Sequence, residues 1–196
     1  MDTITNRTRL AGGAGVAGAA LWAVGLLLQD SLSLTKPGNP LYAANQIVFI
    51  LAQTAWVVCI LGLIWAGAMG TGRLARSAAV VMAAGMALWP IGSLLALVGI
   101  PADFLIPVAV LVFTIGSILT TIAILVVGRW HGWQRFTPLL QVLYYVGVVS
   151  VSMTAGGAGA RGEPSLPLLL LWSVPFALLG LALLTEGSSP AVLRTA

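Results

Sequence analysis

Six long apolar stretches dominate this sequence and limit what it can fold into. They cover residues 10–28, 41–69, 78–99, 104–128, 137–154 and 166–185. Each stretch is long enough, as an α-helix, to cross a hydrocarbon layer about 30 Å thick. Only 7% of the 196 residues are charged, whereas soluble domains usually carry about 25%. The sequence therefore predicts an all-α fold, a polytopic integral membrane protein whose residues 1–196 form one domain, a six-transmembrane-helix bundle.

The basic residues alternate between the two ends of these predicted helices. Seven of the nine belong to one end, namely Arg7, Arg9, Arg73, Arg76, Arg129, Arg135 and Arg194. The alternate connections contain only Lys36 and Arg161. Because cytoplasmic loops carry an excess of Lys and Arg, we expect both termini to be cytoplasmic. The net charge of +4 is then a signal of orientation, and we expect no nucleic acid partner.

The composition also indicates a cellular location. The chain is rich in Ala and Gly, has eight Arg to one Lys, and contains the stretch Gly-Trp-Gln-Arg-Phe-Thr-Pro-Leu-Leu at residues 132–140. In these respects it resembles small multi-spanning proteins of high-GC bacteria. The resemblance implies a bacterial plasma membrane and no particular activity.

The scarcity of cysteine and histidine excludes several classes of functional site. Cys59 is the only cysteine, so there is no CxxC motif for zinc or redox chemistry. His131 is the only histidine and lies outside the apolar stretches, which excludes a haem held by two intramembrane histidines. We therefore expect no metal and no cofactor. The middle of every stretch lacks Asp, Glu, Lys and Arg, which argues against an ion pump with a buried carboxylate.

Neutral polar residues concentrate toward the predicted outer half of the bundle. Gln46 and Gln53 are seven residues apart on one predicted helix, at depths of about 8 Å and 18 Å. Trp89 and Ser93 approach the same half from the next predicted helix, and Asp30 and Asp103 lie at outer helix ends. These residues predict a ligand cavity that faces outward, lined by the first four, with the two aspartates at its mouth. The alternative is that the polar side chains only join helices by hydrogen bonds.

Three functions follow from these expectations. The first is a protein without catalysis of its own, which binds a lipid-like or hydrophobic small molecule in that cavity or acts as a membrane partner subunit. The second is a membrane-embedded enzyme on an apolar, isoprenoid-like substrate, with Asp30 or Asp103 as the acid. The third is a small transporter of a neutral solute. Expected partners are membrane lipids, a hydrophobic small molecule, and either a second copy of the chain or another membrane protein.

Overall fold

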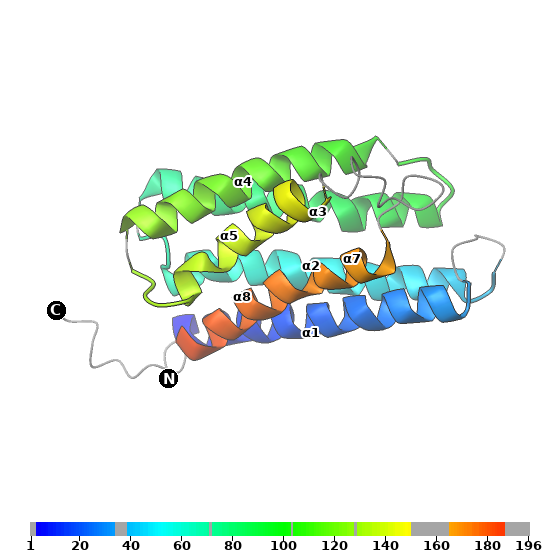
Figure 1. Ribbon diagram of the computed structural model, residues 1–196, viewed down its shortest axis with the longest axis horizontal. Coiled ribbons are helices and arrows are strands. Elements are labelled where there is room, and N and C mark those ends of the chain that lie inside the picture. Colours follow the sequence, from blue (N-terminus) through cyan, green and yellow to red (C-terminus); the bar gives the residue numbers. More distant parts are fainter. Residues whose placement is uncertain are drawn as a thin grey trace.

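The protein is a bundle of α-helices. The computed structural model describes residues 3–33, 39–70, 72–102, 104–127, 129–149 and 165–186 (Figure 1). Its long helices are α1 (Thr3–Ser31), α2 (Tyr42–Ala66), α3 (Arg73–Leu97) and α4 (Leu105–Val127). Shorter helical segments follow, namely η1 (Gln134–Phe136), α5 (Thr137–Val142), the π-helical η2 (Leu143–Val149), α7 (Leu166–Leu171) and α8 (Ser173–Glu186).

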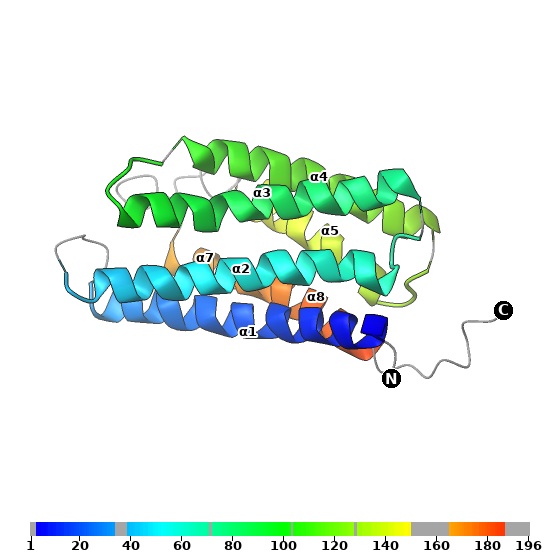
Figure 2. The ribbon, with the colours of Figure 1, turned by 180° about the vertical axis from the view of Figure 1, so that it is seen from behind.

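The helices pack as a ring. Each of α1 to α4 contacts the next α-helix along the chain, α5 contacts α8, and α8 contacts α1. Figures 1 and 2 show α1 and α8 on one side of the bundle and α3 and α4 on the other. The start of α1 and the end of α8 lie at the same end of the bundle (Figure 1). This arrangement is the one that an even number of membrane crossings requires.

The predicted helical bundle is confirmed, with differences in the individual helices. Five segments of the described chain are long and apolar enough to span a membrane, Leu166–Glu186 being the last of them. The predicted crossing at 137–154 is α-helical only to Val142 and π-helical to Val149, and residues 150–154 lie outside the described part. The sixth crossing, the cytoplasmic termini and the bacterial location therefore stay predictions.

Local chemistry explains where the observed helices begin and end. The predicted stretch 41–69 stops being helical at Ala66 because Gly67 adopts the left-handed conformation, with φ of 66°. The N–H of Ala68 then bonds to the carbonyl of Leu63, which satisfies an end carbonyl of the helix. Pro175 lacks an N–H and its ring crowds the carbonyl four residues earlier. The predicted helix 166–185 is accordingly interrupted at Trp172, between α7 and α8.

Glycines allow the closest contacts between helices. A Cβ atom on Gly12 of α1 would lie 2.7 Å from the carbonyl oxygen of Gly180 of α8, and one on Gly180 would lie 2.6 Å from the carbonyl oxygen of Gly12. The α3–α4 crossing is equally reciprocal, because a Cβ on Gly85 would collide with the backbone of Phe113 and one on Gly116 with the backbone of Met82. Close backbone approach of this kind stabilises helix pairs in membranes, where the hydrophobic effect between helices is lost.

An aromatic cluster fills the centre of the ring. It contains nine rings from all sides of the bundle, namely Trp22, Phe49, Trp56, Trp89, Phe113, Tyr144, Tyr145, Trp172 and Phe176. Trp172, at the break between α7 and α8, is central, with its ring centroid 4.9 Å from that of Trp22 and 5.1 Å from that of Trp56. The indole N–H of Trp22 donates to the carbonyl of Leu169 at 2.9 Å. This hydrogen bond joins α1 to the short α7.

Candidate functional site

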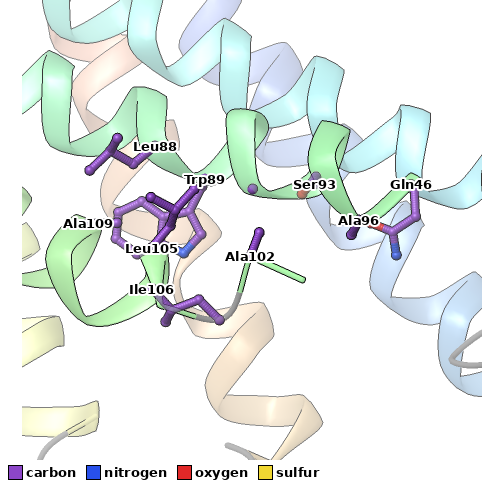
Figure 3. Close-up of a pocket in the computed structure, with 10 residues that line it drawn as sticks. Gln46, Leu88, Trp89, Ser93, Ala96, Ala102, Leu105, Ile106 and Ala109 are labelled. Carbon is purple, nitrogen blue, oxygen red and sulfur yellow. The ribbon is translucent and has the colours of Figure 1, made fainter. Parts of the chain in front are cut away.

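A cavity of about 180 Å³ lies between α2, α3 and α4 (Figure 3). It is at the end of the bundle where α3 ends and α4 begins. Its lining is formed by Gln46, Leu88, Trp89, Gly92, Ser93, Ala96, Ala102, Leu105, Ile106 and Ala109. Three of the six residues predicted to form an outward-facing site, Gln46, Trp89 and Ser93, therefore line one cavity.

Small residues leave this space open beyond the α3–α4 crossing. At Gly85 the backbone of α4 approaches so closely that no Cβ fits. Seven residues further along α3, a Cβ on Gly92 would meet only the Cδ1 atom of Leu105, at 4.0 Å. Ala96 follows Gly92 by one turn and keeps the wall of the cavity thin. The cavity is thus the space left where the two helices no longer touch closely.

Trp89 forms a firm wall of the cavity because other rings support it. Its ring centroid lies 6.0 Å from that of Phe113, in an edge-to-face arrangement, and 5.4 Å from that of Trp172. Aromatic pairs at such distances stabilise each other by about 0.5–1.5 kcal/mol beyond the area that they bury. Trp89 therefore connects the cavity directly to the aromatic cluster at the centre of the bundle.

Two polar side chains face the cavity from different helices. Gln46 and Ser93 are both half-buried, and within the described residues neither side chain has a hydrogen-bond partner. Figure 3 shows Trp89 grouped with Leu105 and Ile106, Gln46 beside Ala96, and Ser93 between these groups. An amide and a hydroxyl can each donate and accept a hydrogen bond. The arrangement can therefore hold an apolar group next to a polar one.

Gln53 lies elsewhere, in the interior of the ring. It is 4% exposed, and its Oε1 atom has no hydrogen-bond partner among the described residues. It does not line the cavity, although it shares α2 with Gln46. The inward face of α2 is marked instead by Asn45, Phe49, Gln53 and Trp56. Gln46 and Gln53 are thus seven residues apart on α2, but only Gln46 lines the cavity.

Asn45 is a buried polar residue that the sequence reasoning missed. It is 3% exposed, and in the described structure neither of its amide atoms has a hydrogen-bond partner. Its burial could have been predicted, because Asn45 precedes Phe49 by four residues and Gln53 by eight, and this spacing places all three on one face of a helix. Buried unpaired amide atoms are costly, and within the described residues both Asn45 and Gln53 carry such atoms.

Of the two aspartates expected at the mouth of the cavity, Asp30 belongs to the described part of the chain and lies elsewhere. Asp30 is exposed at the end of α1, where it borders a separate hollow of about 250 Å³ with Gln29 and Ser33 of the same segment and Leu166 and Leu169 of α7. Asp103 lies outside the described residues. No group of three His, Cys, Asp or Glu side chains in the described ranges is close enough to hold a metal ion.

No protein family model, no curated protein and no solved structure matches this chain. The assignment of a function consequently depends on the geometry of the cavity and on the chemistry of the residues around it.

Proposed function

We propose that this membrane protein binds a lipid-like or hydrophobic small molecule in the cavity between α2, α3 and α4. The observation that carries the proposal is the convergence of Gln46, Trp89 and Ser93 on one otherwise apolar cavity. Binding sites for small molecules are typically apolar, with a few polar groups that orient the ligand.

The volume of the cavity limits what it can hold. A dry cavity of about 150 Å³ accepts a molecule of the size of benzene, and complete drug-sized ligands need about 300–1,000 Å³. At about 180 Å³, the cavity fits one ring or a short branched segment. The bound molecule would place that segment beside Trp89, while the rest of it extends into the surrounding membrane.

The polar groups indicate which end of the molecule enters. Gln46 and Ser93 can bond a hydroxyl, a carbonyl or an ether oxygen next to the apolar segment. Among the residues that the structure describes, none of those lining the cavity is ionisable. A neutral amphiphile with a small polar head therefore suits the cavity better than an ion does. With the orientation that the basic residues predict, such a molecule enters from the outer leaflet.

Native mass spectrometry of the full chain in mild detergent tests the proposal, with the small molecules that co-purify extracted and identified. One defined amphiphile at fixed stoichiometry supports it. We expect Gln46→Leu to lower the occupancy of that molecule about fivefold, because a lost hydrogen bond costs about 1 kcal/mol. Gln53→Leu is the matched control on the same helix and should change the occupancy less than twofold.

The same experiment can contradict the proposal in two ways. Equal losses in Gln46→Leu and Gln53→Leu would mean that both amides support the fold and that neither orients a ligand. Retention of bulk phospholipid alone, together with another protein, would favour the role of a membrane partner subunit.

A further inference from the structure

A second hollow lies between α3 and α4, on the other side of their crossing. It has a volume of about 760 Å³, and its walls are formed by the beginning of α3, the end of α4 and the turn before α3. Small side chains such as Ala75, Ala78 and Ala123 form its floor, and exposed apolar ones such as Leu119 and Val126 form its sides. We name this hollow the basic-end groove. It is independent of the cavity that carries the proposed function.

Arg129 gives this groove its charge. It is the one charged residue among those that line the groove in the described part of the chain. A Cβ atom on Gly67 would lie 3.2 Å from Nη1 of Arg129, so the guanidinium lies over the turn that ends α2. No described carboxylate pairs with Arg129, and its side chain is exposed. The guanidinium is therefore available to an anion from outside the chain.

The neighbouring residue holds Arg129 in place. Trp130 is 2% exposed and packs in a cluster with Leu63, Ala68 and Met69. Met69 also lines the groove. Because Trp130 is buried in this way, the backbone next to Arg129 is fixed beside the groove.

The start of α3 adds further positive potential at the same end. Its N-cap is Gly72, whose lack of a side chain leaves the first-turn N–H groups without a side-chain cap, and the first turn contains no acidic residue. Uncapped N–H groups and the helix dipole both favour an anion at such a position. Arg73, the first residue of α3, is exposed there as well.

We propose that the basic-end groove binds an anionic phospholipid, with its phosphate on Arg129 and the start of α3 and an acyl chain along the floor between α3 and α4. The charge at one end and the apolar floor beyond it match the two parts of such a lipid. Basic pockets between transmembrane helices recognise anionic head groups in this way. From Leu74 to Val81 the lining of the groove extends for about 10 Å along α3, which accommodates the part of an acyl chain nearest the head group.

The test measures lipid binding to the full chain by native mass spectrometry, with phosphatidylglycerol and phosphatidylcholine as the two probes. We expect phosphatidylglycerol to bind at least fivefold more tightly. Arg129→Gln should lower its affinity about fivefold to tenfold, since one basic side chain near a membrane surface contributes about 1 kcal/mol. Arg129→Lys, which keeps the charge, should retain most of the affinity.

Arg76→Gln is the matched control. It removes the same charge near the same end of the bundle, and Arg76 is exposed but does not line the groove. We expect it to change the affinity for phosphatidylglycerol less than twofold. Equal losses in Arg76→Gln and Arg129→Gln would overturn the proposal in favour of diffuse surface charge.

Two further outcomes would also overturn it. Equal affinity for phosphatidylcholine would mean that the groove makes only the non-specific contact with lipid that any membrane-facing surface makes. Displacement of phosphatidylglycerol by an equal concentration of glycerol phosphate would show that the acyl chain contributes nothing. If Arg129→Gln does not fold, the comparison of the two lipids on the unaltered chain, with and without glycerol phosphate, still decides the question.

Discussion

The cavity and the basic-end groove lie on either side of one helix crossing, and most of their walls belong to the same two helices. The cavity measures about 180 Å³ and is lined by an indole, an amide and a hydroxyl among apolar groups. The groove measures about 760 Å³ and is lined by small and branched apolar residues with one arginine. One pair of helices thus presents two different chemistries at its two ends.

The tight crossing between α3 and α4 accounts for both spaces. Gly85 and Gly116 bring the two backbones together near the middle of the pair. Toward each end, side chains have to fill a widening space, and small residues such as Gly92 and Ala75 leave part of it empty. Which molecule fits each space is then set by the few polar or charged side chains at that end.

The largest expected effect comes from the crossing itself. Gly85→Ala should lower the free energy of unfolding by about 2 kcal/mol or more, because the new methyl group meets backbone and cannot be relieved by a side-chain rotation. Gly92→Ala on the same helix should be neutral or stabilising by up to about 1 kcal/mol, since alanine favours the helix and has room there. Thermal unfolding in detergent, followed by tryptophan fluorescence, measures both. Equal changes in the two variants would contradict the role given to the crossing.

An effect of intermediate size should separate the two binding sites. Ser93 lines the cavity and Ser77 lines the groove, so the same substitution can be made at each end of α3. Ser93→Phe should lower binding of the co-purified amphiphile about tenfold and leave phosphatidylglycerol binding unaffected. Ser77→Phe should lower phosphatidylglycerol binding about tenfold and leave binding of the amphiphile unaffected. A tenfold loss corresponds to about 1.4 kcal/mol. Native mass spectrometry reports both ligands, and loss of both in either variant would mean that the sites are not independent.

The smallest expected effect concerns salt. Raising the ionic strength from about 0.1 M to about 1 M shortens the Debye length from about 10 Å to about 3 Å. The affinity of the groove for phosphatidylglycerol should then fall about threefold, because Arg129 is exposed. Binding in the cavity should stay constant, as its described lining has no charge. A salt titration in detergent micelles compares the two affinities. An equal dependence of both on salt would contradict the view that only the groove binds its ligand through charge.

Three residues of the cavity lining could be predicted from the sequence, for a simple geometric reason. Consecutive membrane helices run in opposite directions, so the beginning of one and the end of the next share a level. That rule brought Gln46, Trp89 and Ser93 to one end of the bundle, and the structure places them around one cavity. The rule gives the depth of a residue, however, and says little about the direction in which it faces.

The direction in which each side chain faces explains the differences at Gln53 and Asp30. Gln53 has a suitable depth but faces the interior of the ring, and Asp30 borders a hollow next to α7. Both outcomes depend on which helices are neighbours. Arg129 shows the same limit, because its position in the sequence indicated only orientation, whereas its place beside the groove depends on the burial of Trp130.

The class of fold follows from the sequence alone. Apolar stretches of membrane-spanning length have to be helical, because their backbone groups can be satisfied within the lipid only by their own hydrogen bonds. Which helix surfaces meet depends on the tertiary structure. Gly85 contacts α4 and Gly180 contacts α1, pairings between residues distant in the chain that no local pattern specifies. In lipid, where all apolar faces are nearly equivalent, close backbone contact selects the neighbours, and with them the position of each cavity.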